Sequence, residues 1–144
     1  MIVFTENKYP IAKDITWDDA IEKISKESSK MVVIYENSSP NPPTFFLMED
    51  YYPGTIGNTF EAVSKDSGVK VMHMYTSFGS NSMTFGRHYD PVDVLLVQAK
   101  GSTTYQCDDD TYTLNPGDSL FIPKESYHNP IVSGPRVTLS FSWE

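Results

Sequence analysis

Short runs rich in β-branched and aromatic residues, separated by turn-forming residues, fill the chain from Val69 to its end. In VKVMHMYTSF the apolar and other residues alternate, as in a strand with one face on a core. Short strands at close, regular spacing are typical of a β-sandwich or a β-barrel. The runs are VKVMHMYTSF, SMTFGRHYD, DVLLVQA, TTYQC, TYTLN, SLFIP and RVTLSFSW.

Helical periodicity is confined to the first part of the chain. Apolar residues recur at helical spacing over residues 17–26, acidic residues occupy the first turn, and Thr16 is placed to cap the helix. A second helix is predicted over residues 60–65, with Asn58 or Thr59 as its cap.

The remaining N-terminal segments predict one strand, over residues 31–35, and a proline-rich loop over residues 38–43. The whole pattern predicts a mainly β, single-domain protein. Residues 1–68 form an extension with one or two helices that packs on a barrel, and the helix and loop cover one end of it. Residues 69–144 form the barrel.

Composition narrows the classes of function. The chain has 144 residues, which suits one domain, and a net charge of -8 with a pI of about 4.7. This charge argues against nucleic acid and anionic membranes as partners. A lone Cys107 fits a reducing compartment, and no signal peptide or membrane-spanning apolar run is present, so we expect a cytoplasmic protein.

The strongest candidate for chemistry is His88-Tyr89-Asp90 together with the distant His128. Side chains at i and i+2 of a strand point to the same face, so one strand could aim His88 and Asp90 at one metal ion. His128 would then complete the 2-His-1-carboxylate triad of non-haem Fe(II) enzymes. The alternative is that all three merely form hydrogen bonds inside a barrel.

Two motifs resemble those of the cupins. Residues 117–123 (GDSLFIP) followed by His128 resemble the second cupin motif, in which Gly and Pro precede a metal-binding His. Residues 88–90, the strand 93–99 and Gly101 resemble the first motif. The resemblance covers about half the chain, from residue 69 to the end, and implies a double-stranded β-helix barrel.

Within the cupins, RHYDPVDVLLVQAKG resembles the JmjC-type 2-oxoglutarate oxygenases, particularly the branch that hydroxylates ribosomal proteins. The resemblance implies that His88, Asp90 and His128 bind Fe(II), and that 2-oxoglutarate is the cosubstrate for hydroxylation of a substrate C–H bond. Zn, Ni or Mn are alternative metals.

The chain departs from this branch at the cosubstrate site. Thr103 stands where a basic residue grips the far carboxylate of 2-oxoglutarate, and about Met74 stands where an Asn is frequent. A buried dicarboxylate needs a cation. Lys100, Arg87 or Arg136 could supply it from another direction.

Several other residues are candidates for the pocket. Ser77 and Tyr105 could donate hydrogen bonds to a carboxylate, and with Thr103 and Lys100 they complete the predicted cofactor-binding set. Tyr75, Phe121 and Ser140 could face the barrel interior, although core packing is the usual role of such aromatics. His73 lies on an alternating strand, where it either faces solvent, is satisfied inside the barrel, or lines the pocket. Strand alternation directs Tyr89 and Asp93 away from the metal, and Cys107 is expected to be an inert buried thiol.

Three functions remain open. The first is an Fe(II)/2-oxoglutarate oxygenase. The second is a metal-binding cupin without 2-oxoglutarate, such as a small-molecule binding module, an isomerase or another dioxygenase. The third is a barrel that serves only as a scaffold. We expect a small-molecule or peptide substrate, and a homodimer is an option if residues 136–143 form a sheet edge.

Overall fold

The computed structural model describes residues 1–26, 30–48 and 51–144. Its helices are the 3-10 helix η1 (Pro10–Asp14), α1 (Trp17–Lys26) and α2 (Gly54–Ser67). Its strands are β1 (Val3–Thr5), β2 (Met31–Ile34), β3 (Thr44–Leu47), β4 (Val71–Ser77), β5 (Val94–Lys100), β6 (Thr103–Cys107), β7 (Asp110–Leu114), β8 (Ser119–Ile122), β9 (Asn129–Val132) and β10 (Arg136–Ser142).

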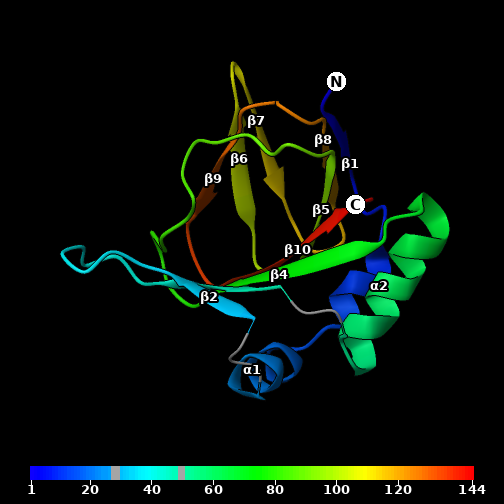
Figure 1. Ribbon diagram of the computed structural model, residues 1–144, viewed down its shortest axis with the longest axis horizontal. Coiled ribbons are helices and arrows are strands. Elements are labelled where there is room, and N and C mark those ends of the chain that lie inside the picture. The colour runs from blue at the N-terminus through cyan, green and yellow to red at the C-terminus, as the bar shows by residue number, and fades with distance from the viewer. Residues whose placement is uncertain (27–29, 49–50) are drawn as a thin grey trace.

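The strands form two antiparallel sheets. The larger has the order β1-β8-β5-β10-β4-β3-β2, and the smaller has the order β7-β6-β9. Figure 1 shows the smaller sheet standing over one face of the larger sheet, with α1 and α2 on the other side. The protein is therefore mainly β, with the barrel interior between the sheets, as the sequence predicts.

Strand alternation divides the large sheet into two faces. On β10, Val137, Leu139 and Phe141 are fully buried in a core shared with the helices. Arg136, Thr138, Ser140 and Ser142 take the alternate positions and face the barrel. A second, smaller core fills the space between the sheets, and it comprises Val94, Leu96, Tyr105, Cys107, Leu114, Leu120 and Ile122.

The beginning of α1 confirms the predicted cap. The Asp19 amide donates to Thr16 Oγ1 and the Thr16 amide donates to Asp19 Oδ2, both at 3.0 Å. This reciprocal pair satisfies two amides that the first turn would leave without partners.

The predicted start of the second helix is wrong. α2 begins at Gly54 after Pro53, so Asn58 and Thr59 lie inside it rather than capping it at residue 60. Thr59 is fully buried and its hydroxyl donates to the Thr55 carbonyl, one turn earlier. Burial of Thr59 thus overrides its local preference for a cap.

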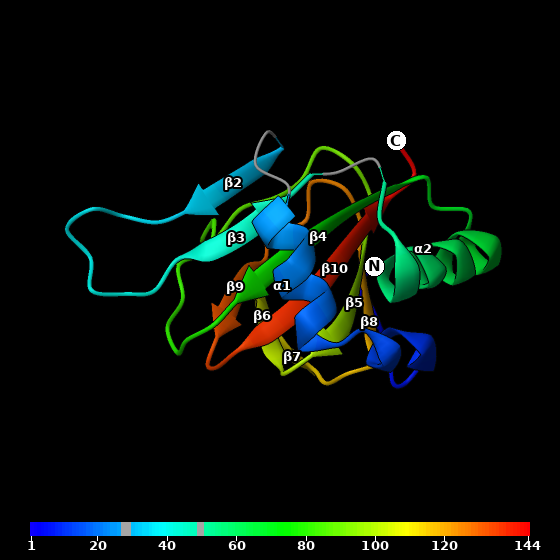
Figure 2. The same ribbon diagram turned by 90° about the horizontal axis from the view of Figure 1, so that it is seen from below.

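Residues 1–68 contribute strands to the barrel as well as helices beside it. β1 pairs with β8, and β2 and β3 extend the large sheet beyond β4. The helix was expected over one end of the barrel, and this is wrong: α1 lies across the outer face of the large sheet (Figure 2). Its apolar residues join the core of that face, so the barrel interior stays clear of it.

Three further expectations about strands are corrected. β10 is not an edge, because it pairs with β4 on one side and β5 on the other. Residues 82–90 form no strand, and their one ladder contact is the bridge between His88 and His128. Phe121 faces the outer core with Trp143 rather than the barrel interior.

Among the residues described, no helix is long and apolar enough to cross a membrane.

Candidate metal centre

The two histidines are held together by backbone pairing. The His88 amide donates to the His128 carbonyl at 2.9 Å, and the His128 amide donates to the His88 carbonyl at 2.8 Å. The imidazole centroids lie 4.4 Å apart as a result. A full strand was predicted to position His88, but in the structure this single antiparallel bridge positions it next to His128.

Asp90 completes the cluster. Its Oδ2 lies 3.4 Å from His128 Nε2, and its Oδ1 lies 4.0 Å from His88 Nε2. The hydrogen bond from His128 lowers the pKa of the Asp90 carboxyl, and the charges of both imidazoles act in the same direction. The carboxyl is therefore ionised at neutral pH, as a metal ligand must be.

Both imidazoles are oriented by their other nitrogen. His88 Nδ1 lies 2.7 Å from the Gly86 carbonyl, and His128 Nδ1 lies 3.0 Å from the Ser126 carbonyl. A carbonyl only accepts hydrogen bonds, so each Nδ1 carries a proton, and each Nε2, which is directed toward Asp90, is the nitrogen left to bind a metal ion. This is the arrangement typical of metal-binding histidines.

The three side chains fit a divalent metal ion. One ligand atom from each of His88, Asp90 and His128 lies within 4.8 Å of the other two. Two imidazole nitrogens and one carboxylate oxygen form the donor set of non-haem iron oxygenases and also suit Zn, Ni or Mn. Asp93, as expected, points elsewhere, and its carboxylate accepts from the Lys124 amide.

The cluster opens into a cavity of about 330 Å³ inside the barrel. This volume is at the lower end of the range for small-molecule sites, roughly 300–1,000 Å³. Besides the triad, the cavity wall includes the polar side chains of His73, Tyr75, Tyr105, Arg136, Ser140 and Ser142.

Arg136 is the buried cation of this cavity. Its side chain is 2% exposed, Nε donates to Ser77 Oγ at 3.0 Å, and Nη1 donates to Thr138 Oγ1 at 3.0 Å. The guanidinium also lies over the Tyr75 ring, 5.3 Å from its centroid. Within residues 1–26, 30–48 and 51–144 no carboxylate pairs with it. A guanidinium bound only by neutral groups is suited to an anionic ligand.

Of the four predicted cofactor-binding residues, one lines the cavity and three do not. Tyr105 lines the cavity, and burial raises the pKa of its phenol, which therefore stays a neutral donor. Ser77 and Thr103 lie behind the wall: Ser77 accepts from Arg136, and Thr103 Oγ1 is 3.3 Å from Thr138 Oγ1. Lys100 is outside the cavity wall, and its Nζ donates to the Lys13 carbonyl at 2.8 Å.

Of the three cations considered as replacements, only Arg136 reaches the cavity. Arg87 lies outside it, with its guanidinium 4.0 Å from the Tyr127 ring centroid and 3.9 Å from Asp108. Met74 faces the outer core, so it does not occupy a pocket position.

Two aromatic residues that line the cavity, Phe46 and Phe85, are not predicted by the sequence pattern. Phe85 lies in the loop before His88, where the sequence has no periodicity that would predict which way its side chain points. Phe46 is on β3, a strand that was not predicted. The cavity positions of Tyr75 and Arg136 can be predicted from the sequence, because every second residue on β4 and β10 is polar and these residues share one face of the sheet.

Comparison with known proteins supports the assignment of the fold. The AraC-like ligand binding domain family matches residues 73–143. The Escherichia coli ribosomal oxygenase YcfD, of the JmjC type, superposes with a TM-score of 0.73 at 14% identity over 99% of this chain. The protein has the cupin fold. This cupin spans about half the length of YcfD, since the match covers 48% of that chain.

Two further YcfD structures contain ligands. One, with cobalt and 2-oxoglutarate, matches 100% of this cupin and 48% of that chain at a TM-score of 0.73 and 14% identity. Another, with cobalt and succinic acid, matches 99% of this cupin and 48% of that chain at a TM-score of 0.74 and 13% identity. At such identities the likeness concerns the fold. No curated protein matches the sequence significantly.

Proposed function

We propose that this cupin is an Fe(II)- and 2-oxoglutarate-dependent hydroxylase, with His88, Asp90 and His128 as the metal ligands. The observation that carries the proposal is the buried Arg136, which lies in the same cavity as the triad and to which no carboxylate of the described residues is paired. A protein that only bound a metal would have no use for this costly uncompensated charge.

Arg136 takes the role that a basic residue at position 103 has in the resembling enzymes. Thr103 and Arg136 both approach Thr138 Oγ1, at 3.3 Å and 3.0 Å. The small side chain at 103 therefore leaves room for a cation that arrives from β10. In this arrangement Arg136 binds the far carboxylate of 2-oxoglutarate, and the neutral phenols of Tyr75 and Tyr105 are available as further donors.

With both groups bound, the chemistry supplied is the conversion of 2-oxoglutarate and O₂ to succinate and CO₂, coupled to insertion of one oxygen atom into a substrate C–H bond. The residues of the chain hold and orient the reactants. The Gly86 and Ser126 carbonyls would keep both Nε2 atoms directed at the metal ion.

Titration of the anaerobic Fe(II) protein with 2-oxoglutarate tests this function. We expect the weak visible metal-to-ligand charge-transfer band of a chelated 2-oxo acid. Arg136→Met should keep the metal and bind 2-oxoglutarate about 10- to 100-fold more weakly, the usual value of hydrogen bonds to a charged group. Arg87→Met is the matched control, since this arginine lies outside the cavity, and its titration should equal that of the wild type.

Two results would contradict the proposal. Tight metal binding without the band would exclude 2-oxoglutarate chemistry. A band with unchanged affinity in Arg136→Met would show that the carboxylate is held elsewhere.

A metal-binding cupin without 2-oxoglutarate is the second candidate. The match of residues 73–143 to a family of ligand-binding domains favours it. In that case the cavity binds a small anionic molecule between the metal and Arg136, and the metal acts as a Lewis acid or binds the molecule directly. Under either candidate we propose a small-molecule or peptide substrate and a cytoplasmic location.

A further inference from the structure

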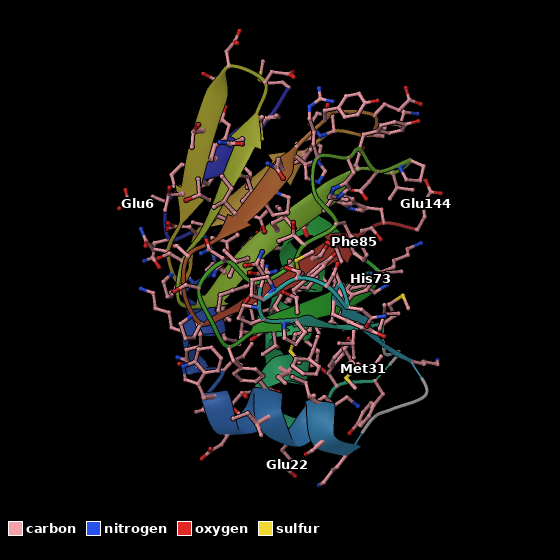
Figure 3. The ribbon with its side chains drawn as sticks, turned by 90° about the vertical axis from the view of Figure 1, so that its left-hand side faces the viewer. Glu6, Glu22, Met31, His73, Phe85 and Glu144 are labelled. Carbon is pink, nitrogen blue, oxygen red and sulfur yellow. The ribbon has the colours of Figure 1, made fainter. Side chains whose placement is uncertain are left out.

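The cavity has a second part that neither the metal nor Arg136 accounts for. Phe46, Phe85 and His73 line it, from β3, the loop before His88, and β4. Figure 3 labels Phe85 and His73, which both line the cavity and lie near each other in that view.

These three side chains form one aromatic cluster centred on Phe46. The Phe46 ring meets the His73 ring edge-on, at 5.3 Å and 86°, and the Phe85 ring at 5.5 Å and 89°. It also stacks on Tyr75 at 4.5 Å and 27°. A compact group of rings on a cavity wall binds flat apolar groups through stacked and edge-to-face contacts.

The cluster adjoins the metal centre. The centroid of Phe85 lies 6.1 Å from that of His88, at an interplanar angle of 78°. A group held against Phe85 therefore lies next to the metal rather than at a remote surface. In an oxygenase this is the place of the substrate's reacting carbon.

The charged residues of the cavity wall indicate that a group bound against these rings is neutral. Asp90 is the one carboxylate on the wall among the described residues, and it belongs to the triad. Arg136 is in the same cavity and disfavours a second cation. Burial lowers the pKa of His73, so its imidazole is neutral at neutral pH.

His73 adds a hydrogen-bonding group to this apolar wall. No hydrogen bond to its ring nitrogens is present within the structure described here, and its side chain is half-buried in the cavity. A neutral imidazole has one donor and one acceptor nitrogen. It can therefore make one hydrogen bond with a group that lies against Phe46 and Phe85.

We propose that Phe46, Phe85 and His73 form the binding site for the primary substrate, and that the substrate presents a neutral aromatic group carrying a hydrogen-bonding atom. The inference rests on the proposed function for the role of the site, but the binding of an aromatic group is testable apart from it. The cavity of about 330 Å³ admits one such group beside the cosubstrate, so the substrate is a small molecule or a single side chain.

The experiment uses the Zn(II)-loaded protein, which is diamagnetic and needs no turnover. Indole is titrated by NMR, with tetramethylammonium as a cationic probe. We expect indole to bind and tetramethylammonium not to bind. Phe85→Ala should weaken indole binding about 3- to 10-fold, as loss of an aromatic pair does, with Zn(II) affinity unchanged.

Phe78→Ala is the matched control. Phe85 is 48% exposed and Phe78 is 45% exposed, so neither truncation removes a core side chain. Phe78 contacts Trp17 and Phe45 and does not line the cavity, so its variant should bind indole like the wild type.

A second probe tests this hydrogen-bonding group, His73. 1-Methylindole lacks the N–H donor, so it should bind more weakly than indole to the wild type. In His73→Phe the two probes should bind equally. Equal binding of both probes to the wild type would overturn the role of His73.

The outcomes separate this inference from the proposed function. Phe85-dependent indole binding without a 2-oxoglutarate band would retain the aromatic site and reject the oxygenase. A normal band without indole binding, or with binding insensitive to Phe85→Ala, would overturn the aromatic site. Tighter binding of tetramethylammonium than of indole would overturn it as well.

Discussion

At the scale of single residues, the metal centre depends on how three side chains are oriented rather than on their identity alone. Two carbonyl groups fix the imidazoles of His88 and His128, and Asp90 lies between their Nε2 atoms. Nothing in the spacing of these residues reveals the carbonyl partners, which come from backbone turns just before each histidine.

Asp90→Ala should abolish metal binding, because two imidazoles alone leave a divalent ion without its anionic ligand. Isothermal titration with Co(II) measures the effect, and a loss of at least 100-fold in affinity is expected. Asp93→Ala is the control, since that carboxylate binds the Lys124 amide and leaves the triad intact. Retention of metal affinity in Asp90→Ala would show that the triad is assigned wrongly.

The buried thiol of Cys107 predicts a pH dependence. Burial, and after it the carboxylates of Asp108 and Asp110, raises its pKa from 9.0 to about 11. The unfolded chain loses this proton near pH 9 while the folded protein keeps it, so the contribution to stability is present below pH 9 and is lost as the pH rises toward 11. At pH 10 the loss is about 1.4 kcal/mol.

Urea unfolding at pH 8 and pH 10 tests this, with Cys107→Ala as the comparison. The variant should lack this part of the alkaline loss, while other titrating groups contribute equally to both proteins. An identical pH dependence in both would contradict the prediction.

At the scale of elements, the sequence predicted a helix start correctly where residues close in the chain satisfy its backbone hydrogen bonds. It failed where tertiary packing determines which residue begins the helix. The Thr16 cap of α1 was predictable because its partner, Asp19, is three residues away. The start of α2 at Gly54 was not, because Thr59 looks like a cap and is buried instead. At Gly117 the backbone φ of +94° favours glycine, and a Cβ there would lie 2.5 Å from Asn7 Oδ1, so this residue of the GDSLFIP motif is required by the fold.

Thr16→Ala should therefore destabilise the protein by about 1 kcal/mol, the usual cost of losing a cap. The free energy of unfolding in urea measures it. Thr16→Ser keeps the hydroxyl and should retain most of the stability, whereas equal losses in both variants would show that the cap contributes nothing.

At the scale of the whole molecule, the topology limits the ways in which copies could associate. β10 is central, and the edges of the large sheet are β1 and β2. A homodimer thus stays a prediction, and a sheet-edge dimer would use β1 or β2 of the large sheet, or β7 or β9 of the smaller one. Both edges of the large sheet expose apolar side chains, with Val3 and Phe4 on β1 44% and 39% exposed and Val32 and Val33 on β2 40% and 37% exposed, so either could support such pairing.

The cluster of His88, Asp90 and His128 also joins distant parts of the fold, so a metal ion bound there, as we propose, should stabilise the whole molecule. A ligand at 100 times its dissociation constant adds about 2.7 kcal/mol, or roughly 10 °C in Tm for a domain of this size. Thermal unfolding with Co(II) and with EDTA measures the shift. It should vanish in Asp90→Ala, and a shift that persists in that variant would place the metal elsewhere.

The sequence by itself determined the mainly β fold and the cap of α1, because strand alternation and helix capping are local properties, and its motifs singled out the three residues that the structure brings together, His88, Asp90 and His128. The tertiary structure decided the rest. It placed β10 at the centre of the sheet, brought Arg136 to the cavity while Lys100 and Arg87 stayed outside, and gathered Phe46, Phe85 and His73 on one wall. These arrangements depend on pairing between segments far apart in the chain, and no pattern within a single segment contains that information.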